Sequence, residues 1–314
     1  MDTREKSEEA KEEAAIMEKT HRKNKMDLSL GLEGTHVLVT GAAGYIGSAT
    51  VLAFLSAGAN VTALDIRPDA LAELHDKFPK DSNAHLATIR CDITDESALE
   101  YAFVSAKELH GPVACCIALA SLDLSVLEHH DSLMDMPLEQ WQRTFKVNVE
   151  GTFLTARTWL RGLKMCKLEG RGEGLRNVGL VIVGSESGTF GERGNADYAA
   201  GKSAVQGGLL QSLRADVGRV WEGARVNAIA PGPVNTAQFV KECEANPEQL
   251  WLDAQATTAM RQPVSTEVVA KSILYLASEV WSGHVLGQVL SVDSGKMGKV
   301  MWTKEECAAM EKQS

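Results

Sequence analysis

Several features that would point to a membrane, a nucleic acid or a disulfide framework are missing from this sequence. No run of 18 apolar residues occurs, so no membrane-spanning helix is expected. A formal net charge of -10 argues against binding to a phosphate backbone, which needs clustered Lys and Arg. The six cysteines include no C-x-x-C pair, and Cys115 and Cys116 lie inside an apolar run. We therefore expect reduced thiols, a cytosolic location, and no nucleic acid or membrane among the partners.

Aromatic residues are few, at 5%, but hydrophobic residues make up 44% of the 314 residues and can form a sizeable core. Residues 1–30 mix charges of both signs with few large apolar side chains and lack the apolar segment of a secretory signal. We predict a charged, flexible extension over 1–30, one domain over 31–295, and a C-terminal tail over 296–314. Residues 231–263 are too long for an ordinary connection and are predicted to form a substrate loop.

Seven short apolar runs predict buried β-strands. They are rich in Val, Ile and Leu without polar alternation, which is typical of strands buried on both faces of a parallel sheet. Each is separated from the next by room for a helix. The runs cover residues 36–40, 60–64, 85–90, 113–119, 179–184, 225–230 and 289–293. The sequence therefore predicts an α/β fold, a doubly wound Rossmann fold with a seven-stranded parallel sheet flanked by helices.

Gly41, Gly44 and Gly47 lie between the first predicted strand and a predicted helix. Glycines there let the backbone approach a pyrophosphate, and the helix N-terminus adds partial positive charge. Asp65 ends the second predicted strand, where a carboxylate can bind an adenosine ribose and repel a 2′-phosphate. This favours NAD(H), while Arg67 keeps NADP(H) possible. The alternative interpretation is a set of plain turn glycines.

Tyr198 and Lys202 are four residues apart in the segment YAAGKSAV, one helical turn from each other on the same face. An ammonium beside a phenol stabilises the phenolate and lowers its pKa, so Tyr198 could exchange a proton with a substrate oxygen. Ser185 follows a predicted strand and would face the crevice at the carboxyl ends of the sheet. The alternative is an ordinary surface pair on a helix.

From about residue 33 to 295 the chain resembles the short-chain dehydrogenase/reductases, in the shorter, single-domain branch of that family. The resemblance rests on ordered motifs: TGAAGYIG (40–47), CDITD (91–95), VNVEGTF (147–153), GSESG (184–188), YAAGK (198–202), RVNAIAPGPVNT (225–236) and GQVLSVDSG (287–295). It implies an enzyme that interconverts a secondary alcohol and a ketone on a small organic substrate by hydride transfer to or from NAD(P)(H).

By this resemblance, Tyr198 is the general acid/base, Ser185 polarises the substrate oxygen, Lys202 lowers the phenol pKa and binds the nicotinamide ribose, and Asn148 holds a relay water. The implied cofactor-binding residues are Gly41, Gly44, Tyr45, Ile46, Gly47, Asp65, Arg67, Asp92, Ile93, Ala118, Ala120, Tyr198, Lys202, Pro231, Gly232, Val234 and Thr236. The helices expected near 137–167 and 196–220 resemble those with which the family dimerises, which predicts a homodimer or homotetramer.

Two positions depart from the family pattern. The middle glycine comes one residue early, so Tyr45 takes its customary place and is expected near the pyrophosphate. The family's Asn-Asn-Ala-Gly after the fourth strand is replaced by Ala118 to Ser121, which removes two side chains that ordinarily support the sheet. A cofactor-binding scaffold without catalysis is therefore kept as an alternative, as is an epimerisation, dehydration or cyclisation in the same pocket.

Two further groups have a functional and a structural interpretation. Glu128 to Asp131, EHHD, could suggest a metal site, but neighbouring side chains in a loop rarely converge on one ion, so no metal is predicted. Trp251 could form an apolar wall over the substrate with Phe239, Leu250 and Met260, or simply pack within the 231–263 loop.

Overall fold

The computed structural model describes residues 26–77, 85–305 and 307. Most of the predicted charged extension, residues 1–25, lies outside this part, as do residues 308–314 of the predicted tail. The described chain forms a seven-stranded sheet with the order β3-β2-β1-β4-β5-β6-β9. Every pairing in it is parallel. This is the doubly wound order, whose direction reverses between β1 and β4.

All seven predicted strands are confirmed, with ends that move by no more than two residues. They are β1 (His36–Thr40), β2 (Asn60–Asp65), β3 (Leu86–Arg90), β4 (Cys115–Ala118), β5 (Gly179–Val183), β6 (Arg225–Pro231) and β9 (Val289–Val292). A separate pair, β7 (Val234–Asn235) with β8 (Val264–Ser265), was not predicted, because two-residue strands leave no periodic pattern.

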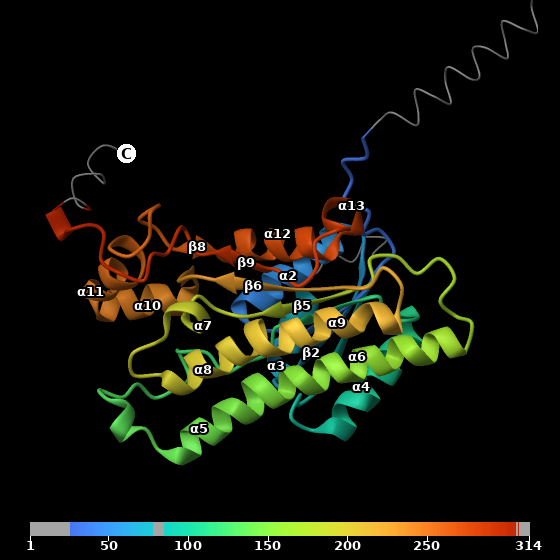
Figure 1. The fold of residues 1–314 in the computed structure, drawn as a ribbon, viewed down its shortest axis with the longest axis horizontal. Helices are drawn as coiled ribbons and strands as arrows, with labels where there is room; N and C mark the ends of the chain where they lie inside the picture. The colour runs from blue at the N-terminus through green and yellow to red at the C-terminus, as the bar shows by residue number, and fades with distance from the viewer. Residues whose placement is uncertain (1–25, 78–84, 306, 308–314) are drawn as a thin grey trace, which may run out of the picture.

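Helices cover both faces of the sheet (Figure 1). On one face lie α2 (Tyr45–Ser56), α3 (Pro68–Asp76) and α12 (Thr266–Ala277), and on the other lie α4 (Glu96–His110), α6 (Gly151–Leu168) and α9 (Leu210–Val220). The remaining helices are α5 (Leu138–Phe145), α7 (Ser187–Phe190), α8 (Ala196–Ala204), α10 (Ala237–Ala245), α11 (Pro247–Gln249) and α13 (Glu279–Ser282). A short 3₁₀ turn, η1, covers Leu133–Asp135, and π-helical turns occur at η2 (Lys146–Glu150), η3 (Val205–Leu209) and η4 (Leu250–Gln255).

Alternate residues of the central strands supply two separate cores. In β4, Cys115 and Ile117 pack with α2 and α12, whereas Cys116 and Ala118 pack with α4 and α6. Because both faces are covered, a strand with no polar side of its own is stable here. This explains why the strands appear as unbroken apolar runs in the sequence.

Residues 231–263 form a small helical layer rather than an irregular loop. It contains β7, α10, α11 and η4, and residues after β9 pack onto it. The backbone N–H groups of Met297 and Met301 donate to the carbonyls of Thr257 and Ala256, and the indole of Trp302 donates to Thr258 O at 3.2 Å. The described part of the predicted C-terminal tail therefore belongs to the folded body.

His36 lies buried at the start of β1, at the end of the sheet opposite the glycine loop. Its Nδ1 is 2.8 Å from Gly111 O and its Nε2 is 2.9 Å from Thr62 Oγ1. Burial lowers the pKa of His36 to about 4. Between that value and the unfolded value near 6.5, the unfolded chain binds the proton more readily.

We predict that neutral His36 contributes fully to the free energy of unfolding above about pH 6.5. This contribution should be lost as the pH falls to about 4, a decrease of about 3 kcal/mol. The free energy of unfolding, measured in urea between pH 4 and 7, should change with pH by about 3 kcal/mol less in His36→Gln than in wild type. The exposed His75 in α3 offers a matched control, His75→Gln. Equal pH dependence in wild type and His36→Gln would contradict the prediction.

Candidate active site

The carboxyl ends of β1, β4, β5 and β6 meet at one edge of the sheet, around the point where the strand order reverses. Ligands of open α/β sheets bind at this edge. The predicted site residues follow these strands: the glycine loop after β1, Ala118 to Ser121 at β4, Ser185 after β5, and Pro231 to Thr236 at β6. The topology thus brings the separate motifs of the sequence to one edge.

The glycine loop has the geometry of a phosphate-binding turn. Gly41 has a φ of 67°, and a Cβ on it would lie 2.7 Å from Ala120 Cα. A Cβ on Gly47 would lie 2.1 Å from Gly41 O, so only glycine allows α2 to start this close to β1. No side chain caps α2, and its first turn has no acidic residue, which leaves N–H groups there free for a phosphate. These residues fit a dinucleotide pyrophosphate.

Asp65, at the end of β2, is buried and joins the glycine loop to Arg67. Its Oδ2 accepts from Ala43 N at 3.0 Å, and its Oδ1 accepts from Arg67 N at 3.0 Å and from Arg67 Nε at 3.3 Å. The carboxylate therefore shapes the loop as well as offering lone pairs to a ribose. Arg67 itself is 58% exposed and folds back on Asp65.

The other expected cofactor residues divide into two groups. Tyr45 is half exposed at the start of α2, Asp92 is exposed, and Gly232 and Val234 are half-buried after the buried end of β6, Pro231. Ile46, Ile93 and Ala118 instead contribute to the two cores, and Thr236 caps α10 by accepting from Phe239 N at 3.0 Å. The side chains of this second group are engaged within the protein, so these residues would contact a cofactor mainly through their backbone atoms.

Thr40 holds the segment after β4, where the family pattern has asparagines. Its hydroxyl donates to Ile117 O at 3.3 Å and accepts from Leu119 N at 3.1 Å and from Ala120 N at 3.2 Å. This fixes the segment after β4 against the end of β1, next to the contact between Gly41 and Ala120.

Tyr198 and Ser185 lie together, as expected. Tyr198 is 8% exposed on α8, and the side chain of Ser185 acts on its phenol in the direction that lowers the phenol pKa. Ser185 is held by Gln206 Oε1, which accepts from its backbone N–H at 2.9 Å, and its Oγ accepts from Ser187 N at 3.1 Å.

The phenol pKa differs from the sequence-based expectation. Burial raises the pKa of Tyr198 above its usual value, and the hydrogen bond from Ser185 opposes only part of that rise. The negative charges of Asp123, Glu192 and Glu186 add to it. Lys202 Nζ is 5.6 Å from the ring centroid and donates to Val183 O and Ser121 Oγ, so its charge does not outweigh the effects that raise the phenol pKa.

Lys202 is 3% exposed beneath the segment that follows β4. Its Nζ donates to Val183 O at 3.0 Å and to Ser121 Oγ at 3.2 Å. Burial lowers the pKa of Lys202 to about 8, and the charge of Asp123 opposes the fall. The amine is therefore mostly charged at neutral pH.

Asn148 lies in the π-helical turn η2, between α5 and α6. Its Oδ1 accepts from Leu122 N at 2.7 Å and its Nδ2 donates to Leu122 O at 2.9 Å. A π-helical turn shifts the side chains of a helix and often marks a functional position. Asn148 thus holds the segment that contains Ser121.

Several charged residues beside Tyr198 were not predicted from the sequence. Glu186 forms an ion pair with Lys296 at 3.3 Å, and burial raises the pKa of Glu186 to about 7. Glu192 accepts from Ser187 Oγ at 2.9 Å. Glu186 could have been suspected from its place directly after Ser185, but no pattern in the sequence connects Lys296 to the site.

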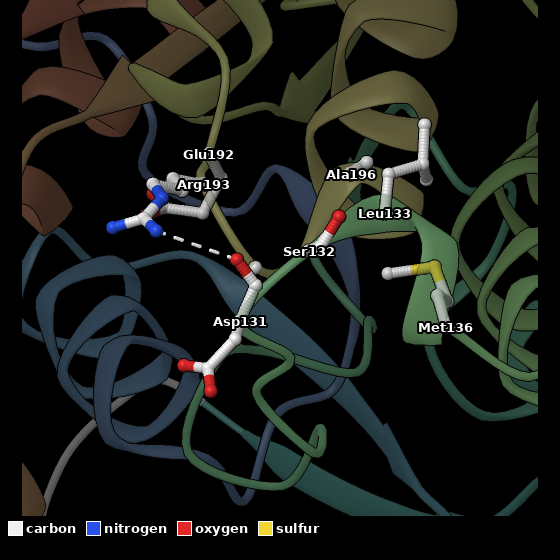
Figure 2. A pocket seen from close by; sticks show the side chains of 8 residues that line it. Asp131, Ser132, Leu133, Met136, Glu192, Arg193 and Ala196 are labelled. Atoms are coloured by element: carbon white, nitrogen blue, oxygen red, sulfur yellow. Dashed lines mark hydrogen bonds between the residues drawn. The ribbon is translucent and has the colours of Figure 1, made fainter.

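A cavity of about 520 Å³ lies beside α8 (Figure 2). One wall comes from the segment around η1, and the other from the residues between α7 and α8, whose Arg193 donates to Asp131 O at 3.4 Å. The lining residues are Asp131, Ser132, Leu133, Met136, Glu192, Arg193, Gly194 and Ala196. Because neither Ser185 nor Tyr198 lines it, the cavity flanks the candidate reacting centre rather than containing it.

The two histidines of EHHD bond to protein groups. His129 Nδ1 is 3.3 Å from Asn195 Oδ1, and His130 Nε2 is 2.9 Å from Gln140 Oε1. Within residues 26–77, 85–305 and 307, no three His, Cys, Asp or Glu side chains gather as metal ligands. Over the same residues, no helix combines the length and apolar character needed to cross a membrane.

Trp251, at the start of η4, is packed against the segment that follows β9. The Nζ of Lys304 lies 5.0 Å from the centroid of the Trp251 ring system. This contact favours the packing interpretation of Trp251 over a substrate wall.

The sheet order and the glycine loop define a Rossmann-type nucleotide-binding protein. A family model described as enoyl-(acyl carrier protein) reductase matches residues 41–296. The chain belongs to the short-chain dehydrogenase/reductase family, and it is an oxidoreductase of that family, whose members bind NAD(H) or NADP(H).

Two curated relatives cover most of the chain. The 3-oxoacyl-(acyl-carrier-protein) reductase FabG of Thermotoga maritima is 31% identical over 271 residues, covering 84% of this chain and 98% of that protein. Galactitol 2-dehydrogenase (L-tagatose-forming) of Cereibacter sphaeroides is 33% identical over 271 residues, covering 84% and 95%.

Solved structures show the same fold. A 7α-hydroxysteroid dehydrogenase in complex with NADH and 7-oxo glycochenodeoxycholic acid is 26% identical, with a TM-score of 0.72 over 87% of this chain and 98% of that one. Levodione reductase, 20% identical with a TM-score of 0.70 over 84% and 97%, shares the fold.

We predict that Gly47→Ala lowers the affinity for NADH by about tenfold or more, because the added Cβ would meet Gly41 O and displace the loop. Fluorescence titration with NADH measures this effect. Gly162→Ala in α6 is the matched control, since a Cβ there meets nothing within 4 Å. Unchanged affinity in Gly47→Ala would contradict the assignment of the loop.

Proposed function

We propose that this chain interconverts a secondary alcohol and a ketone on a small organic substrate, with Tyr198 as the general acid/base. The observation that carries the proposal is that Tyr198, Ser185 and Lys202 are buried together, with Tyr198 and Lys202 one turn apart on α8, at the carboxyl edge of a dinucleotide-binding sheet. The activities for which the two relatives are named support it, since galactitol dehydrogenation and 3-oxoacyl reduction both interconvert an alcohol and a ketone.

The glycine loop and Asp65 would hold the dinucleotide, with Lys202 at its nicotinamide ribose. When bound, that group supplies or accepts the hydride. The protein then has to orient the substrate oxygen and manage one proton. Ser185 can donate a hydrogen bond to the oxygen, and Tyr198 can pass its phenolic proton to the same oxygen as negative charge develops there.

The environment of Tyr198 favours the acid form needed for ketone reduction. Its raised pKa keeps the phenol protonated at neutral pH, so a proton donor is in place before reaction. The charged Lys202, close to the ring, stabilises the phenolate that remains after the proton has left. We therefore propose that the resting enzyme holds the protonation state needed for ketone reduction near neutral pH, and that alcohol oxidation first requires loss of the phenolic proton.

No observation favours epimerisation, dehydration or cyclisation in the same pocket. The scaffold alternative is weakened by the names of the relatives, which are dehydrogenases and reductases. We also propose a homodimer or homotetramer through α5, α6, α8 and α9. Its support is the set of exposed apolar side chains on two of these helices: Leu138, Phe153, Met165 and Leu168.

Tyr198→Phe should lower kcat for ketone reduction by about 10²- to 10⁴-fold, because it removes the proton donor. NADH binding, measured by fluorescence, should stay within about threefold of wild type. Tyr101→Phe on the exposed face of α4 is the matched control and should keep full activity. Cofactor oxidation followed at 340 nm against a panel of ketones tests both variants, and an active Tyr198→Phe would refute the mechanism.

We propose NAD(H) as the preferred cofactor, because the buried carboxylate of Asp65 would repel a 2′-phosphate. Titration with NADH and NADPH should give at least about tenfold tighter binding of NADH, or about 1.4 kcal/mol. Tighter binding of NADPH would mean that Arg67 outweighs Asp65.

A further inference from the structure

Ser121 stands where the family pattern has a glycine, and its side chain contacts the buried lysine. The distance from Lys202 Nζ to Ser121 Oγ is 3.2 Å, and a glycine could not make this contact. Ser121 is half-buried, in the segment that joins β4 to the residues around η1. The serine that replaces the family's glycine therefore gives Lys202 a polar partner in the candidate site.

The ammonium of Lys202 has few partners for a group buried this deeply. It carries three N–H donors. The hydrogen bonds found in the described chain go to Val183 O and Ser121 Oγ, so Ser121 is the side-chain acceptor. A hydrogen bond to a charged group stabilises that charge more strongly than a bond between neutral groups, whereas burial disfavours the charge.

The surrounding segment holds the Ser121 hydroxyl in place. Thr40 Oγ1 binds the N–H groups of the two preceding residues, Leu119 and Ala120. Asn148 binds both the N–H and the carbonyl of the following residue, Leu122. Because Ser121 is fixed on both sides, its hydroxyl is pre-organised to accept from Lys202 rather than adapting to it.

We propose that Ser121 is a positioning residue that keeps Lys202 protonated and directed at the Tyr198 site. The inference rests on the proposed function and adds a link between two of its residues: Asn148 holds the segment that carries Ser121, and Ser121 holds Lys202.

The other charged groups around the lysine do not replace this contact. Asp123, two residues further on, acts on Lys202 through its charge and is itself bonded to Ser125. Glu186 and Glu192, from the residues around α7, act on the phenol of Tyr198 through their negative charge. Glu186 is further engaged by Lys296, and Glu192 by Ser187.

The pKa of Lys202 can be measured directly in protein carrying ¹³C-labelled lysine, by NMR titration of its Cε signal, assigned with Lys202→Arg. Ser121→Ala removes an acceptor of the charged form, so the pKa of Lys202, about 8 in the wild type, should fall by about one unit. Ser121→Gly, which restores the residue of the family pattern, should give the same fall. Ser121→Thr keeps a hydroxyl and should keep the value near that of wild type.

The pH profile of kcat/KM gives an independent readout. For ketone reduction, kcat/KM should fall at alkaline pH as Lys202 loses its proton. In Ser121→Ala this fall should begin about one pH unit lower, matching the expected change in the Lys202 pKa. Leu124→Ala, at an exposed position of the same segment, controls for general loosening and should leave both measurements unchanged. Thermal unfolding shows whether each variant is folded.

An unchanged Lys202 pKa in folded Ser121→Ala would overturn the inference, as would a fall of equal size in Leu124→Ala. These outcomes differ from failure of the proposed function, which an active Tyr198→Phe would reveal while the lysine titration still reports on Ser121.

Discussion

The close approach of β1 and β4 at their carboxyl ends is the constraint on which the site depends. There the backbone of Gly41 lies against Ala120 so tightly that any side chain on Gly41 would collide with it. Thr40 fixes the same junction with three hydrogen bonds of its hydroxyl. One junction therefore sets the position of the candidate phosphate loop on one side and of the segment bearing Ser121 on the other. A displacement at Gly41 would move both halves of the site together.

Burial at this edge decides the charge state of the groups above it. The same desolvation raises the pKa of Tyr198 and lowers that of Lys202, so each group is pushed towards its neutral form. For the phenol this favours the protonated donor. For the lysine, burial disfavours the charged form, so hydrogen-bond acceptors fixed in the protein have to replace the water molecules that would otherwise solvate the ammonium. The carboxylates near Tyr198 add to the first effect, which explains why a lysine one turn away does not produce the acidic phenol expected from the sequence alone.

The sequence predicted the sheet well, because buried parallel strands leave continuous apolar runs and the glycine motif marks the first turn. It also predicted that Ser185 and Tyr198 meet, since a fixed topology brings the end of β5 and the start of α8 together. It could not predict partners that depend on side-chain direction. Lys202 lies on the expected face of α8 yet donates to Ser121 and Val183, and Lys296 reaches Glu186 from beyond the last strand. Neither contact has a periodic or motif signature.

The replacement of the family's asparagines shows how one geometry can be held by different side chains. The backbone N–H groups of the segment after β4 need hydrogen-bond partners, because a buried N–H group without one is costly. Here the hydroxyl of Thr40 accepts from the N–H groups of Leu119 and Ala120, and the side-chain oxygen of Asn148 accepts from that of Leu122, so the segment is held although it carries no asparagine. Small side chains at 118 and 120 allow the glycine loop to approach, and the one polar side chain of the segment, at Ser121, then faces a buried cation. The loss of the asparagines therefore removes support from within the segment while the neighbouring elements, β1 and η2, supply it from outside.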